Sequence, residues 1–282
     1  MITVYHSFCG VPVQTAAPCP MPEDAQGAAF RTEETAPLLQ ITLEPVETLP
    51  EPAGELCGRA GEKTVWRSGT AITRRTRDVC RPIPHIQTCY DLTDPSRVRA
   101  LIRREDWAWA AGTKYLWTGL AVNQLLLHFR TLFFHAAYVD WQGKGILFTA
   151  PSGTGKSTQA ELWRKYRGAA VINGDKAAVS LGKTPVLHSV PFSGTSGICK
   201  NSSTPLAAVV VLSQAPENTV EPMGPTQALA AICGNVFVEQ TVPEEWSLAL
   251  NLLLDLAQTV PIYHLACTPD ERAVEKLEQV II

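Results

Sequence analysis

The sequence lacks an excess of positive charge. Its 24 Lys and Arg residues are outnumbered by 27 Asp and Glu residues, which gives a formal net charge of −3 at pH 7. Domains that bind nucleic acids usually carry a surplus of Lys and Arg gathered on one face or along one helix. The composition therefore predicts a protein that does not bind DNA or RNA.

Targeting and membrane signals are also missing. The N-terminal residues MITVYHSFCG contain no basic segment followed by an apolar run and a small-residue cleavage site. The most apolar stretch, residues 115–134, is interrupted by polar side chains that would be costly in hydrocarbon, namely Asn123, Gln124, His128 and Arg130. We therefore expect a cytoplasmic protein that does not span a membrane.

Several site signatures are absent as well. The eight cysteines include no C-x-x-C pair, and no His, Cys and Asp residues follow a metal-ligand spacing, so free thiols are expected. The Gly-rich loop, H-R-D and D-F-G motifs of eukaryotic-type protein kinases are not found, which excludes that fold.

What the sequence does contain indicates two domains, because 282 residues exceed the usual size of one small domain. Up to about Leu92, short runs of alternating polarity are separated by stretches rich in Pro and Gly, as in a small β-rich domain. A connecting helix is predicted over Asp94–Ala111, with Asp94 as its cap and Pro95 in its first turn. We place the boundary near Gly112, which gives domains of residues 1–112 and 113–282.

The second domain is predicted to have an α/β core. The run KYLWTGLAVNQLLLHF has helical spacing, and the apolar runs LFFHAAYVD, KGILFTA and PLAAVVVLS are typical of buried strands. Helical patterns such as KSTQAELWRKY and EEWSLALNLLLDLAQTV lie between strands or follow them. Strands separated by helices predict an α/β fold.

Residues Ala150–Ser157, APSGTGKS, fit the P-loop pattern except that Ala150 stands where the first glycine is usual. Gly153 and Gly155 allow the backbone to curl so that its N–H groups surround phosphate oxygens at the positive end of a helix. Lys156 is suited to reach the β- and γ-phosphates, and the hydroxyl of Ser157 to bind Mg²⁺. The predicted ATP-binding residues are Pro151, Ser152, Gly153, Thr154, Gly155, Lys156, Ser157 and Thr158.

A second carboxylate is expected beside this loop. The run AAVINGD ends a buried strand with Asp175. At that position Asp175 could hold Mg²⁺, directly or through water, or accept the proton of an attacking hydroxyl. The alternative is a turn-forming aspartate, because N-G-D is favourable turn chemistry.

The segments FFHAAYVDWQGKGILFTAPSGTGKSTQAELW and RGAAVINGDKAAV resemble the C-terminal catalytic domain of HPr kinase/phosphorylase, a P-loop kinase fold related to phosphoenolpyruvate carboxykinase. The resemblance covers about Phe133 to Val179. It implies such a catalytic domain here, preceded by the small β-rich domain. Asp175 matches one of the family's two adjacent aspartates, whereas Lys176 stands beside it in place of the other.

The resemblance also singles out His135, which stands where the family has a strand histidine and would tune or relay a proton near the γ-phosphate. A satisfied core histidine is the alternative. Residues 191–205, rich in Gly, Ser and Thr, are predicted to form an exposed loop that closes over the nucleotide. Lys200, its one cation, either approaches the γ-phosphate or is an ordinary solvated lysine.

These patterns predict ATP- and Mg²⁺-dependent transfer of a phosphoryl group to a hydroxyl, such as that of Ser, on a peptide, protein or small molecule. HPr itself is not the expected acceptor, because the family's loop for engaging its carrier protein is missing. A nucleotide-binding regulator without transfer is one alternative. A carboxykinase-like enzyme is another, although no arginine-rich substrate motif supports it. The acceptor and the oligomeric state stay open.

Overall fold

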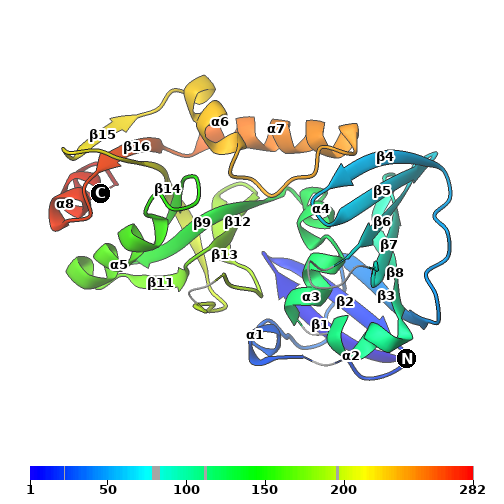
Figure 1. The fold of residues 1–282 in the computed structure, drawn as a ribbon. Coiled ribbons are helices and arrows are strands. Elements are labelled where there is room, and N and C mark those ends of the chain that lie inside the picture. The colour runs from blue at the N-terminus through cyan, green and yellow to red at the C-terminus, as the bar shows by residue number, and fades with distance from the viewer. Residues whose placement is uncertain (22, 78–82, 111–112, 195–196, 282) are drawn as a thin grey trace. The chain divides into compact units, whose positions relative to one another are not determined.

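The computed structural model describes residues 1–21, 23–77, 83–110, 113–194 and 197–281 (Figure 1). The chain is mixed α/β with two sheets and divides into two compact units. The first unit comprises Met1–Phe129 and Glu239–Trp246, and the second comprises Arg130–Val238 and Ser247–Ile282. The change from the first unit to the second thus comes after Phe129, whereas Gly112, the predicted boundary, lies outside the described residues.

One eight-stranded sheet forms the framework of the first unit, in the order β1-β2-β3-β8-β7-β6-β5-β4. The strands β2 and β3, and β3 and β8, pair in parallel, and the other neighbours are antiparallel. The bounds are β1 Ile2–Phe8, β2 Val11–Ala17, β3 Leu39–Val46, β4 Glu55–Ala60, β5 Lys63–Ser68, β6 Ala71–Thr76, β7 Ile86–Asp91 and β8 Asp94–Arg103.

The helix predicted over Asp94–Ala111 is wrong for Asp94–Arg103, which form strand β8. In its second half, buried Val98, Ala100 and Ile102 alternate with residues that are more exposed or belong to the opposite face, so the period is that of a strand. The Asp-Pro pair therefore opens the second strand of a hairpin with β7 rather than a helix. In the described residues up to Ala110, the short elements η1 Arg104–Asp106 and α2 Trp107–Ala110 follow.

The apolar run after residue 112 forms two short helices rather than one. They are α3 Thr113–Gly119 and α4 Val122–Leu127, and Ala121 between them has a φ of 54°, in the left-handed region that ends a helix. A further short helix, α1 Ala25–Ala28, follows β2. In the part of the chain that the structure describes, no helix combines the length and apolar character needed to cross a membrane.

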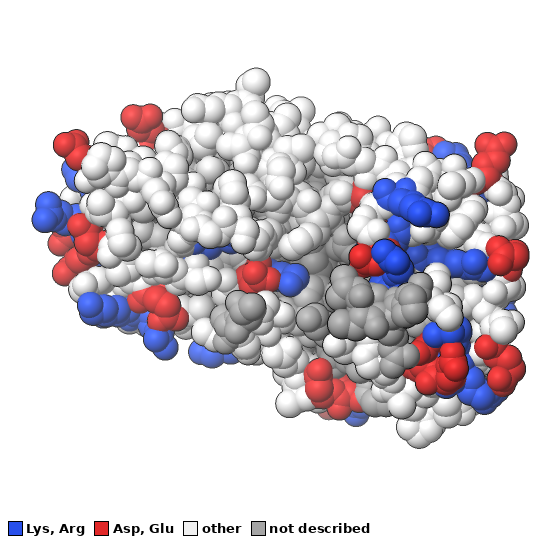
Figure 2. All heavy atoms as spheres, in the orientation of Figure 1, with Lys and Arg blue, Asp and Glu red and all other residues white. Residues whose placement is uncertain are grey.

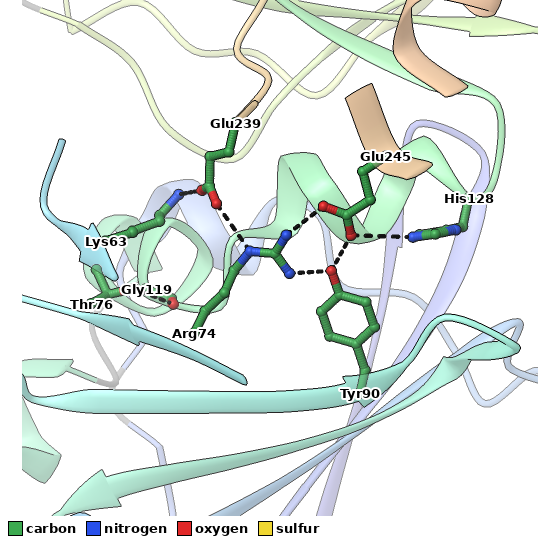
Figure 3. A network of polar contacts seen from close by, with 8 residues as sticks. All are labelled: Lys63, Arg74, Thr76, Tyr90, Gly119, His128, Glu239 and Glu245. Atoms are coloured by element: carbon green, nitrogen blue, oxygen red, sulfur yellow. Dashed lines mark hydrogen bonds and ion pairs between the residues drawn. The ribbon is translucent and has the colours of Figure 1, made fainter. Parts of the chain in front are cut away.

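The first unit also contains a buried polar cluster, which we call the Arg74 network (Figure 3). The Arg74 guanidinium donates to Glu239, with an Nε–Oε2 distance of 3.0 Å, and to Glu245 and the Tyr90 hydroxyl. Lys63 lies 2.8 Å from the second oxygen of Glu239. Arg74 and Glu245 are both fully buried, so each depends on these partners for compensation of its charge.

Exposed charges in this unit are paired locally too. On the face shown in Figure 2, Lys and Arg side chains lie interspersed with Asp and Glu rather than gathered into one basic patch. The ion pairs at its surface include Arg67–Glu244, Arg77–Glu62, Arg99–Glu44 and Arg104–Glu47.

The second unit is built on a sheet with the strand order β10-β9-β12-β13-β14-β16-β15, and β11 pairs with β9. Because β10 also pairs in parallel with β14, the strands from β10 round to β14 close into a ring. The bounds are β9 Thr131–Trp141, β10 Lys144–Thr149, β11 Ala170–Asn173, β12 Lys176–Leu181, β13 Pro185–Ser189, β14 Ser203–Gln214, β15 Thr219–Pro222 and β16 Ile262–Cys267.

In the described part of the second unit, the helices are α5 Lys156–Arg167, α6 Pro225–Cys233, α7 Pro243–Thr259 and α8 Glu271–Ile281. The first turn of α7 is counted with the first unit. Helices α5 and α8 share an apolar core with β9, β10 and β14, in which Trp163 is completely buried. Arg167 of α5 donates to Glu278 of α8 at 2.7 Å. This packing fixes α5, and therefore the loop in front of it, against the sheet.

Candidate functional site

The predicted P-loop lies between strand β10 and helix α5, in the strand–loop–helix setting that the motif requires. Gly153 and Gly155 have φ values of 80° and 120°, which residues with a side chain rarely adopt. A Cβ atom at either position would meet nothing within 4 Å. The two glycines are therefore needed for the backbone turn, and the space above them stays open.

Lys156 begins helix α5 and folds back over the loop. Its side chain is buried, and its Nζ donates to the carbonyl oxygens of Ala150 at 2.9 Å and Pro151 at 3.2 Å. Burial lowers the pKa of the Lys156 ammonium, and the charge of Asp175 offsets part of that shift. Lys156 thus carries a buried charge whose hydrogen-bond partners are neutral carbonyls.

Ser157 and Asp175 are brought together by the turn after β11. The Ser157 hydroxyl donates to the carbonyl of Gly174 at 3.2 Å. The side-chain oxygen of Asn173 accepts from the backbone N–H groups of Asp175 at 3.1 Å and Lys176 at 3.0 Å. Asn173 therefore shapes the turn that presents the carboxylate, a role that the N-G pair signals as turn chemistry but that we did not assign from the sequence.

Both carboxylate oxygens of Asp175 have close partners. His135 Nε2 lies 3.3 Å from Oδ1, and Lys176 Nζ lies 2.8 Å from Oδ2. Burial alone would raise the pKa of the Asp175 carboxyl, but Lys176 and then His135 hold it below its usual value, so the group is ionised at neutral pH. The pKa of His135 is lowered, first by burial and then by Lys156, which favours a neutral ring.

These residues surround one cavity of about 270 Å³. Its lining consists of His135, Ser152, Gly153, Gly155, Lys156, Ser157, Thr158, Gly174 and Asp175. Of the other predicted loop residues, Pro151 contributes the carbonyl that holds Lys156, and Thr154 lines a neighbouring cavity. The structure thus brings the predicted phosphate loop, His135 and Asp175 to one place, while their roles in binding and transfer stay predictions.

Lys200 is a predicted site residue that does not line this cavity. Its backbone N–H donates to the carbonyl of Ile172 at 3.0 Å, which fixes this part of the loop beside β11. Its side chain is exposed, and no contact of the described residues joins its ammonium group to the cavity. This placement fits the alternative prediction, an ordinary solvated lysine.

The loop that carries Lys200 does touch the site at Gly194. A Cβ atom at Gly194 would lie 2.4 Å from Cγ of Asp175 and 2.6 Å from Oδ2, closer than real atoms approach. The absence of a side chain at Gly194 therefore leaves the room in which the Asp175 carboxylate lies. Residues 195 and 196 of this loop are outside the described residues.

The donor set suits magnesium better than a transition metal. Among the described residues, no group of three or more His, Cys, Asp and Glu side chains is arranged to hold a metal ion. Mg²⁺ in phosphate sites needs only one or two protein oxygens, because substrate phosphates and water fill the rest of its octahedron. The Ser157 hydroxyl and the Asp175 carboxylate are oxygens of that kind, and both residues line the cavity.

Comparison with known proteins places the chain in a family. A family model described as "SynChlorMet cassette protein ScmC" matches residues 114–282, more than half of the chain. The chain belongs to the ScmC family. No curated protein matches this ScmC-family chain.

Among solved structures, the ScmC-family chain matches the HPr(Ser) kinase/phosphatase from Coxiella burnetii with 12% sequence identity and a TM-score of 0.32. The match covers 52% of this chain and 93% of that chain. At that TM-score the likeness carries no argument about what this chain does, which must be argued from its own site.

Proposed function

We propose that this ScmC-family protein binds ATP with Mg²⁺ and transfers the γ-phosphoryl group to a hydroxyl of a peptide, protein or small molecule. The proposal rests on one observation: the loop glycines, Lys156, Ser157 and the ionised carboxylate of Asp175 line the same cavity of about 270 Å³. An ammonium group, backbone N–H groups and one carboxylate at a helix N-terminus are the parts that phosphoryl transfer needs.

The cavity suits a triphosphate because its lining includes the glycines and the lysine at the start of helix α5. The N–H groups around Gly153 and Gly155 and the positive end of the helix favour phosphate oxygens. Lys156 would exchange its two carbonyl partners for phosphate oxygens, a stronger charge-assisted contact. Mg²⁺ bound with the nucleotide, held by Ser157 and Asp175, would neutralise phosphate charge.

Asp175 would orient the acceptor hydroxyl and take its proton. Its lowered pKa makes it a weak base, but the loose transition state of phosphoryl transfer asks more for positioning than for strong proton abstraction. His135 and Lys176 hold the two carboxylate oxygens and so fix the direction in which the carboxylate faces. Serine is the acceptor residue type that we propose.

A nucleotide-binding regulator without transfer activity is the second candidate. One observation favours it: both oxygens of Asp175 are already engaged, one by Lys176 and the other by His135. If these contacts persist with nucleotide bound, they keep the carboxylate ionised and so oppose the transfer of a proton to it from an acceptor.

The test compares wild type with Asp175→Asn, using γ-labelled ATP, Mg²⁺ and a pool of serine-containing peptides. We expect labelled peptide with wild type, loss of labelling with Asp175→Asn, and Mg-ATP binding by both in calorimetry. Asp255→Asn, at an exposed aspartate paired with Arg130, is the matched control and should label as wild type does. Equal labelling by Asp175→Asn would remove Asp175 from the mechanism, and binding without labelling or phosphate release by wild type would favour the regulator.

A further inference from the structure

A second cavity, of about 440 Å³, adjoins the phosphate cavity. The two share Gly153, Gly155 and Thr158, so the P-loop forms a common wall. The rest of its lining consists of Thr154, Gln159, Leu212, Gln214, Ala215, Cys267, Thr268 and Pro269. A ligand with phosphates in the first cavity therefore has room for its remaining part on the other side of the loop.

The sheet topology places this cavity where α/β proteins bind ligands. Strands β10, β14 and β16 are parallel neighbours, in the order β10-β14-β16. The P-loop follows β10, Gln214 ends β14, and Cys267, the register partner of Gln214, ends β16. All three strands thus deliver their carboxyl ends to one edge, and α/β proteins commonly bind ligands beyond the carboxyl ends of parallel strands.

The lining has the chemistry of a site for a flat, partly polar group. Leu212, Ala215 and Pro269 supply apolar surface, and Thr268 carries a hydroxyl. Gln159 is 2% exposed, and its Nε2 donates to the sulfur of Cys267 at 3.1 Å. The amide oxygen of Gln159 has no hydrogen-bond partner, and a buried acceptor left unpaired costs free energy that a ligand N–H group would recover.

From these observations we infer that the second cavity binds the nucleoside part of the nucleotide, with the base against the apolar wall and an exocyclic amino group of the base donating to Gln159. This inference rests on the proposed function, because it presumes a triphosphate on the P-loop. It adds that the nucleoside, and not only the phosphates, determines affinity.

The test compares ATP with inorganic tripolyphosphate, both with Mg²⁺, in calorimetry. Wild type should bind ATP at least tenfold more tightly than tripolyphosphate. In Ala215→Trp, whose indole fills the cavity, ATP affinity should fall to that of tripolyphosphate while tripolyphosphate affinity is unchanged. Equal binding of the two ligands by wild type would overturn the inference and leave the phosphate site intact, whereas no binding of either would remove the proposed function itself.

A second measurement needs no substitution. Cys267 lines the cavity, so ATP should slow its alkylation by N-ethylmaleimide several-fold, followed by peptide mass spectrometry, while tripolyphosphate should not. The exposed Cys57 in the first unit is the control and should react equally under all conditions. Unchanged alkylation of Cys267 with saturating ATP would contradict the inference. ATP should also bind more tightly than inosine triphosphate, which lacks the amino group, and equal binding would overturn the assigned role of Gln159.

Discussion

Among the described residues, each unit buries one Lys or Arg side chain, and the two charges are compensated in opposite ways. Arg74 in the first unit lies among Glu239, Glu245 and Tyr90, so opposite charges surround it (Figure 3). Lys156 in the second unit is nearly as buried, yet its hydrogen bonds go to two backbone carbonyls. The charge of Arg74 is therefore balanced by carboxylates, whereas the charge of Lys156 has no carboxylate among its hydrogen-bond partners and can still bind an anion.

Under the proposed function, the difference separates a structural cation, Arg74, from a phosphate-binding one, Lys156. A buried ion pair with all its partners in place holds a fold together, because removing one partner strands the other charge without water. Removing a buried ammonium group that is held by neutral carbonyls should cost less folding stability, because carbonyl oxygens are weaker hydrogen-bond partners than carboxylates. The depressed pKa of Lys156, caused by burial, expresses the same incomplete compensation.

The largest effect should come from Arg74→Met. The substitution strands the buried carboxylates of Glu239 and Glu245, and we expect the free energy of unfolding of the first unit to fall by about 3–5 kcal/mol. Urea unfolding, combined with hydrogen exchange of the β6 amides, measures it. Arg97→Met, at a side chain that is 79% exposed and 3.7 Å from Asp94, is the control and should cost less than about 0.5 kcal/mol. Similar losses in both variants would break the comparison.

Lys156→Ala should mainly affect binding. We expect Mg-ATP affinity to fall about 10- to 100-fold, because a charge-assisted hydrogen bond contributes about 1.5–3 kcal/mol of binding free energy. Thermal stability should change little. Calorimetry and thermal melting measure the two quantities. Lys165→Ala, at an exposed lysine of the same helix that donates to Tyr166, should change neither. A loss of stability as large as that of Arg74→Met would mean that Lys156 is structural as well.

A smaller effect is expected from Gly194→Ala, which sharpens the comparison at the acidic partner of the site. The new methyl group would overlap Asp175 and cost about 1–3 kcal/mol in displacement of the carboxylate or the loop. Phosphate release from ATP should fall, while tripolyphosphate binding by the loop glycines should persist. Gly182→Ala serves as the control, because its Cβ would lie 3.9 Å from the nearest neighbouring atom, the carbonyl oxygen of Thr184. Unchanged phosphate release in Gly194→Ala would show that the position of Asp175 tolerates the displacement.

The sequence predicts the phosphate loop because its parts are close together along the chain. Two glycines, a lysine and a hydroxyl within a few residues, after an apolar run, define the local backbone and its helix end. Asp175 is predicted for a related reason, since it lies in the turn directly after β11, the next strand of the same unit. The predicted helix at Asp94 failed because Asp-Pro begins hairpin strands as well as helices, and only the partner strand β7 decides between them.

The second cavity and the Arg74 network could not be predicted because their residues are far apart in sequence. Gln159 and Cys267 are separated by 108 positions, and Arg74 and Glu245 by 171. No local pattern marks Glu239 or Glu245 as partners of an arginine in another part of the chain. Such contacts depend on which strands become neighbours in the sheet, and that follows from the complete fold.

Because residues 239–246 belong to the first unit, they affect how that unit folds during synthesis and which truncated fragments of the chain can fold. A fragment ending at Phe129 would contain Arg74 and Tyr90 but neither Glu239 nor Glu245, so its central arginine would lack both counter-charges. On the ribosome, the N-terminal sheet likewise waits for more than a hundred further residues before its polar core can be completed. Expression boundaries drawn between the units would separate the arginine from the acids that neutralise it.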